Sequence, residues 1–149
     1  MSIQKYCVLL LAACALAGCK QDKSELVQGQ WACSSVTKDS TIKGDIEYVS
    51  NGKSNGQFEI QLQQEGHAVA VALIAQGDWR VDGDQLVETV TKVSPVAFTV
   101  DGRQLPTSEI PKGLIDGMEG ASTQSKIVHL SNDTMVQDQG GETTTCKKK

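Results

Sequence analysis

The chain has few aromatic residues and no excess of basic charge. Aromatic side chains make up 4% of its 149 residues, and the formal net charge at pH 7 is -4. Proteins that bind nucleic acid usually combine a basic surface with aromatic platforms on which bases stack. These two shortages argue against nucleic acid as a partner.

Residues typical of metal sites and catalytic centres are also scarce. His67 and His129 are the only histidines, and no Cys-x-x-Cys occurs, whereas zinc takes three or four such ligands. Asp82-Gly83-Asp84 lacks the further acidic residues of a calcium loop and is typical of a turn. Neither histidine lies in a recognisable triad signature, and no glycine-rich phosphate loop is present. We therefore expect no enzyme activity, no metal and no cofactor.

Long apolar runs are missing as well. Lys5 precedes a run over residues 8–17, which is shorter than the roughly 18–20 residues that a membrane-spanning helix needs. A positive start followed by a short apolar run is typical of a signal peptide. No later run is long enough to span a bilayer.

The residues that end this run are Leu16-Ala17-Gly18-Cys19. They resemble the lipobox of bacterial lipoproteins. The resemblance implies cleavage between Gly18 and Cys19 and lipidation of Cys19, so that the protein binds the membrane through its N-terminal lipid. In proteobacterial members the next residue influences sorting. Lys20 in place of aspartate implies the outer membrane, with the protein facing the periplasm.

Three segments follow from this division of the chain. Residues 1–18 are the predicted signal peptide, and residues 19–28 are the lipidated cysteine and a polar tether. Residues 29–149 form the predicted folded domain.

Two cysteines, Cys33 and Cys146, remain in that domain. An exported protein folds in an oxidising compartment, where leftover thiols usually pair. We predict a Cys33–Cys146 disulfide joining the first strand to the last. The alternative is two separate buried thiols.

Side-chain alternation and turn residues indicate an all-β domain. Phe58, Ile60 and Leu62 alternate with polar residues, which is typical of a half-buried strand. Residues 67–75 are apolar on both faces and fit a strand better than a helix because glycines flank them. Hairpin turns are predicted at Asn51-Gly52, Asn55-Gly56, Asp82-Gly83 and Asp101-Gly102. We expect about eight antiparallel strands, with a loop or short helix inserted around residues 104–122. That insertion is either a plain connection or a lid.

Three short elements in this domain resemble lipocalins. They are Gly29-Gln30-Trp31, the stretch from Gly77-Asp78-Trp79 to Leu86, and residues 127–136. The resemblance implies a small antiparallel β-barrel with an interior for an apolar ligand, and a cation over the first tryptophan, for which Lys147 is the candidate. Trp31, Ile60 and Trp79 are the predicted cavity residues. The alternative is that both tryptophans belong to the core.

Two roles follow for the domain. The first is a binding module for a small apolar ligand or lipid inside the barrel. The alternative is an interaction protein that binds an envelope protein through its surface or through residues 104–122. The sequence does not identify the ligand or the partner.

Overall fold

The computed structural model describes residues 22–149, so the predicted signal peptide and the Gly18–Cys19 cleavage and lipidation site lie outside the described residues. The helices are α1 (Lys23–Val27), the 3-10 helix η1 (Thr107–Glu109) and α2 (Lys112–Ile115). The strands are β1 (Gly29–Val36), β2 (Ser40–Tyr48), β3 (Lys53–Gln64), β4 (His67–Asp82), β5 (Gln85–Val100), β6 (Arg103–Leu105), β7 (Ser122–Leu130), β8 (Thr134–Gln139) and β9 (Glu142–Lys148). None of the helices in this part of the chain has the length and apolarity needed to cross a membrane.

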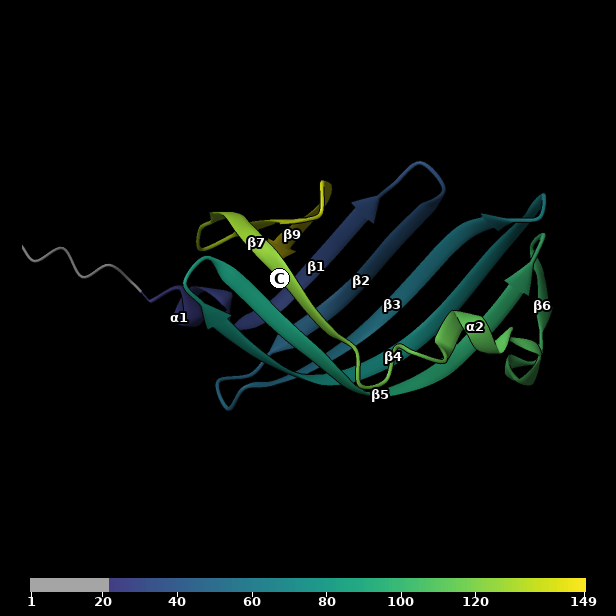
Figure 1. Ribbon diagram of the computed structural model, residues 1–149, viewed down its shortest axis with the longest axis horizontal. Helices are drawn as coiled ribbons and strands as arrows, with labels where there is room; N and C mark the ends of the chain where they lie inside the picture. Colours follow the sequence, from purple (N-terminus) through teal and green to yellow (C-terminus); the bar gives the residue numbers. More distant parts are fainter. Residues whose placement is uncertain (1–21) are drawn as a thin grey trace, which may run out of the picture.

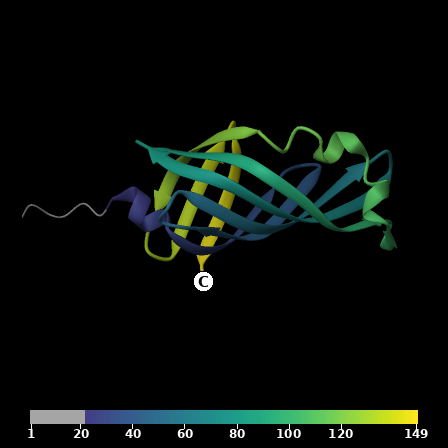
Figure 2. The same cartoon turned by 90° about the horizontal axis from the view of Figure 1, so that it is seen from below.

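The strands form a closed antiparallel barrel (Figures 1 and 2). The sheet order is β4-β3-β2-β1-β9-β8-β7-β5-β6, and β4 also pairs with β5. The ring therefore contains every strand except β6, which extends the far end of β5. Closure leaves few unpaired strand edges, and it confirms the predicted all-β barrel.

The prediction of strand structure for residues 67–75 is confirmed, because β4 covers them. Asp101-Gly102 is a hairpin turn with φ of 50° and 76°, as a type I′ turn requires. The turn predicted at Asn55-Gly56 is wrong, because both residues lie inside β3. Gly56 instead makes room for the Phe58 ring, which a β-carbon at position 56 would overlap.

Two apolar clusters fill the two ends of the elongated barrel. One is built around Trp31, Leu86 and Met135, each of which is completely buried. The other is built around Val71 and Phe98, away from α1. The second cluster is covered by apolar side chains of the segment that follows β6: Ile110, Leu114, Ile115 and Met118.

The predicted insertion at residues 104–122 is therefore present, with one turn of 3-10 helix and one of α-helix. Its apolar residues cover one end of the barrel rather than standing away from it.

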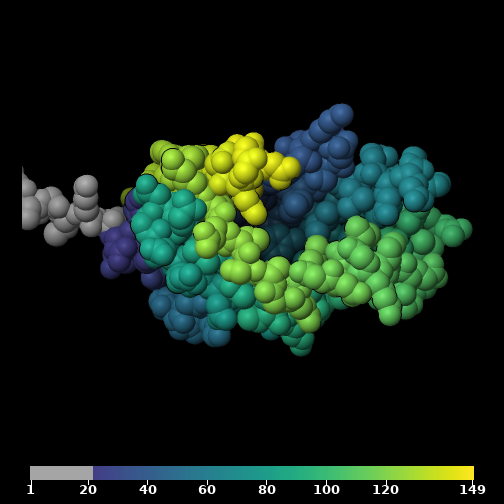
Figure 3. Space-filling view, in the orientation of Figure 1, coloured from purple at the N-terminus to yellow at the C-terminus, as the bar shows by residue number. Residues whose placement is uncertain are grey.

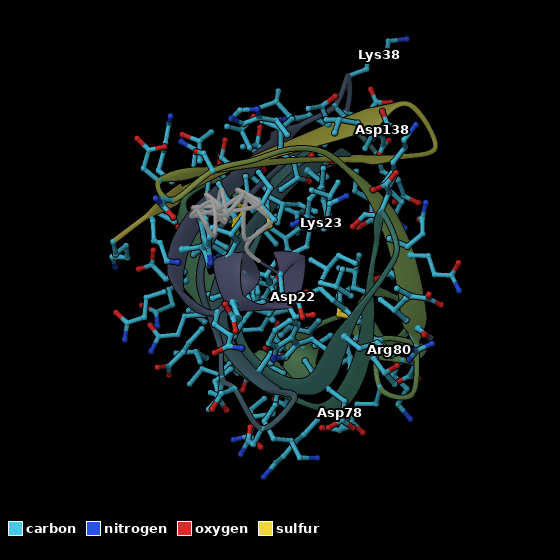
Figure 4. The ribbon with its side chains drawn as sticks, turned by 90° about the vertical axis from the view of Figure 1, so that its left-hand side faces the viewer. Asp22, Lys23, Lys38, Asp78, Arg80 and Asp138 are labelled. Atoms are coloured by element: carbon cyan, nitrogen blue, oxygen red, sulfur yellow. A yellow bond between two sulfur atoms is a disulfide. The ribbon has the colours of Figure 1, made fainter. Side chains whose placement is uncertain are left out.

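The structure differs from the predicted tether over residues 23–28. Asp22 caps α1 by accepting a hydrogen bond from the Ser24 amide at 3.1 Å. Val27 is completely buried, and its carbonyl accepts a hydrogen bond of 2.7 Å from the Trp31 indole. Figure 4 shows α1 lying across the near end of the ring, with Asp22 and Lys23 labelled. The domain thus includes residues that a polar composition had assigned to the tether.

The first and last strands of the barrel, β1 and β9, pair with each other. Cys33 is opposite Cys146 in the β1–β9 register, and the two sulfur atoms are bonded at 2.05 Å, which confirms the predicted disulfide. Lys148, opposite Trp31, places its ammonium 4.9 Å from the centre of a Trp31 ring. The candidate cation Lys147 is wrong by one position: it points outward and donates to the Thr134 hydroxyl at 2.7 Å.

Candidate functional site

A cavity of about 240 Å³ lies inside the barrel, between the two apolar clusters. It is lined by Cys33, Ser34, Ser35, Ile42, Gly44, Ile46, Tyr48, Phe58, Glu88, Ser125, Gln137, Gln139, Glu142, Thr144 and Cys146. The space-filling view shows the surface hollowed beside the yellow β8–β9 hairpin, between it and the green segment before β7 (Figure 3). The cavity therefore opens on the side of the barrel and away from α1.

One wall of the cavity is apolar. Ile42 and Ile46 of β2 share it with Phe58 of β3 and with the disulfide. Glycines make this wall possible, since a β-carbon at Gly44 or at Gly56 would overlap the Phe58 ring. The ring therefore lies against two adjacent strands, where it presents apolar surface to the cavity.

Another part of the lining is polar and buried. The Tyr48 hydroxyl donates to Glu88 Oε1 at 2.8 Å, and the Ser125 hydroxyl donates to Gln137 Oε1 at 2.8 Å. Tyr48, Ser125 and Gln137 are buried. These four residues form what we call the polar floor. Buried polar side chains need partners, and here they supply one another.

Burial shifts the titration of both ionisable groups of this floor. Desolvation raises the pKa of the Glu88 carboxyl, and the hydrogen bond from Tyr48 opposes that shift. Burial is also the largest reason why the pKa of Tyr48 is raised, and the charge of Glu88 adds to it. The environment thus disfavours a negative charge on either side chain.

One carboxyl oxygen of Glu88 has no donor among the described residues. Within residues 22–149 its carboxyl accepts a side-chain hydrogen bond from Tyr48 through Oε1, and no other donor contacts it. No completely enclosed side-chain oxygen or nitrogen in this part of the chain lacks a partner. The second Glu88 oxygen is therefore not completely enclosed, and Glu88 lines both this cavity and a smaller one of about 70 Å³ beside it.

The three predicted cavity residues do not line this cavity. Trp31 and Trp79 belong to the apolar cluster beneath α1, and the Trp79 indole donates to the Val49 carbonyl at 2.9 Å. Ile60 faces inward from β3 and packs against the second cluster. The sequence could have indicated that Glu88 faces inward. Strand side chains alternate between two faces, so Glu88 lies on the same face as Leu86 and Val90.

Residues of the types used in metal sites and catalytic triads are scattered over the described part of the chain. Among them, no three His, Cys, Asp or Glu side chains gather as metal ligands do. Residues 52–56 have the spacing Gly-x-Ser-x-Gly, but they lie where the β2–β3 hairpin enters β3 and not at a strand-to-helix turn. His67 is the first residue of β4 and pairs with Gln64, at the end of β3 that lies far from residues 52–56. His129 is exposed on β7.

The similarity to known proteins lies among solved structures. The chain matches no family model and no curated protein. It is similar to the crystal structure of a lipocalin-like protein from Bacteroides uniformis ATCC 8492, at 13% identity and a TM-score of 0.37, over 83% of this chain and 99% of that one. The strand pairings of this chain by themselves close the barrel.

Proposed function

We propose that this protein is a lipid-anchored binding protein of the bacterial envelope that holds a small ligand in the cavity of its barrel. The observation that carries the proposal is the cavity itself, which combines an apolar wall with a polar floor inside a closed barrel. Ligand sites have this character, because apolar surface provides affinity and a few polar groups orient the ligand.

The size and lining of the cavity favour a small amphipathic ligand over a wholly apolar one. Its volume of about 240 Å³ is below the roughly 300–1,000 Å³ of sites for drug-sized molecules. A purely apolar molecule would cover the polar floor without replacing the hydrogen bonds that water makes to it, which costs free energy. A ligand with one polar group and a short carbon chain satisfies both parts of the lining.

The position of α1 supports an anchored orientation. Asp22 follows Cys19 by three positions, which is at most about 11 Å of extended chain. A lipid on Cys19 would therefore hold the α1 end of the barrel close to the membrane. The cavity opening, which lies away from α1, would then face the periplasm and receive a ligand from there.

Binding can be tested with N-phenyl-1-naphthylamine, an uncharged dye with one N–H donor for the polar floor, which fluoresces in apolar surroundings. The processed protein is placed in lipid nanodiscs, and the signal of empty nanodiscs is subtracted. Thr144→Phe fills the cavity, because Thr144 lines it, and Thr143→Phe is the matched control on the exposed face of the same strand. We expect the unmodified protein and the control to bind the dye and Thr144→Phe to bind it at least about tenfold more weakly. Equal binding by both variants, or no binding above empty nanodiscs, contradicts the proposal.

The second candidate function is docking of an envelope protein on the outside of the barrel. Val96 is 56% exposed and Ile74 is 38% exposed, and both border one shallow depression on the β4–β5 side. A photo-crosslinker at position 96 tests this role in intact membranes. Reproducible capture of one protein, lost when Ile74 is replaced by lysine, would favour docking; capture of none would argue against it.

A further inference from the structure

The charge of the cavity has one sign. Among the described residues that line it, Glu88 and Glu142 are the only charged side chains, and no lysine, arginine or histidine is present. Glu88 lies at the polar floor and Glu142 is exposed at the rim. An anionic ligand, such as a fatty acid, would bring a third negative charge into the same space.

Glu88 is placed to receive a positive group. It lines the cavity and is held by the Tyr48 hydroxyl at one oxygen. Its other oxygen is not completely enclosed and has no side-chain donor within residues 22–149. A carboxylate that is removed from bulk water and only partly hydrogen-bonded is unfavourable until a partner completes it. The floor therefore has an unused acceptor that a ligand can satisfy.

We infer that the ligand of this cavity is a small primary amine with a short carbon chain, whose ammonium group pairs with the free Glu88 oxygen while the chain packs on Ile42, Ile46 and Phe58. The inference rests on the proposed function and names the ligand class of the same site. The ammonium donates hydrogen bonds that Glu88 lacks. Its chain covers the apolar wall.

The alternatives differ in what they offer to Glu88. An alcohol of the same length supplies one neutral donor and binds less tightly, because hydrogen bonds to charged partners are about twice as strong. A carboxylate of the same length supplies no donor when ionised and is repelled by Glu88 and Glu142. The three head groups on one chain length therefore separate the charge effect from the apolar contact.

The test is competition for the dye by hexylamine, hexan-1-ol and hexanoate at pH 8, again with the processed protein in nanodiscs. Three proteins are compared: the unmodified protein, Glu88→Gln and Glu47→Gln. The last variant removes an equal charge from an exposed position on β2. The readout is the ratio of competitor affinities within each protein, so a change in absolute dye affinity does not affect it.

We expect hexylamine to compete at least about tenfold better than hexan-1-ol and better still than hexanoate in the unmodified protein and in Glu47→Gln. In Glu88→Gln the advantage of the amine should disappear. Equal competition by hexylamine and hexan-1-ol, or an amine preference that persists in Glu88→Gln, overturns the amine inference while dye binding still supports the proposed function. Absence of dye binding overturns both.

Discussion

The Phe58 ring occupies the space that a β-carbon at Gly44 or Gly56 would need. We therefore predict that a methyl group added at position 56 changes the stability differently when the Phe58 ring is present and when it is removed. Gly56 lies inside β3 with an ordinary negative φ, so alanine fits its backbone conformation. In a strand, alanine is normally better than glycine by about 0.5–1 kcal/mol. A β-carbon at position 56, however, would overlap the end of the Phe58 ring, and its next neighbour is the Asp45 carbonyl oxygen at 3.2 Å. The ring, not the backbone, is the obstacle.

We therefore expect Gly56→Ala to lower the free energy of unfolding by about 1–3 kcal/mol, which is typical of overpacking. In a Phe58→Ala background the same change should be neutral or stabilising by up to about 1 kcal/mol. The coupling between the two positions would then be at least about 1 kcal/mol.

Gly44→Ala is the matched contrast. A β-carbon there would also lie 2.6 Å from the Gln57 carbonyl oxygen, which removal of the Phe58 ring does not relieve. Urea unfolding of all variants, followed by tryptophan fluorescence, measures the free energies. If Gly56→Ala is equally destabilising with and without the Phe58 ring, or if Phe58→Ala rescues Gly44→Ala as well, the packing described here is incorrect.

Three further predictions concern the disulfide, the polar floor and the anchor. The disulfide closes a loop with a sequence separation of 113, so a Cys33→Ser, Cys146→Ser variant should lose about 5 kcal/mol in the chain-entropy model; a urea midpoint equal to that of the oxidised protein would contradict it. Burial raises the pKa of Glu88, so the folded state holds this proton more tightly than the unfolded state. The stability it contributes is full below the ordinary carboxyl pKa and falls as pH rises through the raised value. The free energy of unfolding of Glu88→Gln, measured in urea, should therefore rise relative to that of the unmodified protein as pH rises from 4 to 8. A difference that stays constant with pH would refute this. Cys19→Ala should accumulate as uncut precursor on gels of whole cells, whereas normal processing would refute the lipobox assignment.

Local sequence patterns were enough to predict the strands and the insertion. The alternation of Phe58, Ile60 and Leu62 reflects a period of two that any strand with one buried face must have. The turn at Asp101-Gly102 depends on local φ preferences. The prediction of the Cys33–Cys146 bond followed from counting cysteines in a chain that is predicted to be exported. Each of these depends on neighbours in sequence or on composition.

The same local rules failed where a residue's role depends on a distant strand. Asn55-Gly56 has the composition of a turn, but the glycine is required by a ring packed across β2 and β3. Lys148 and not Lys147 lies over Trp31, because the β1–β9 register decides which lysine faces inward.

The sequence by itself determined the strand-rich fold and the cysteine pair, since each depends on neighbouring residues or on residue counts. The export signal rests on neighbouring residues in the same way and stays a prediction. Only the tertiary structure decided that both tryptophans fill the core beneath α1 and that the cavity lies elsewhere. It also brought Tyr48 of β2 to Glu88 of β5. The physical reason is barrel closure, which places inward-facing side chains from non-adjacent strands around one interior, in a register that no single strand specifies.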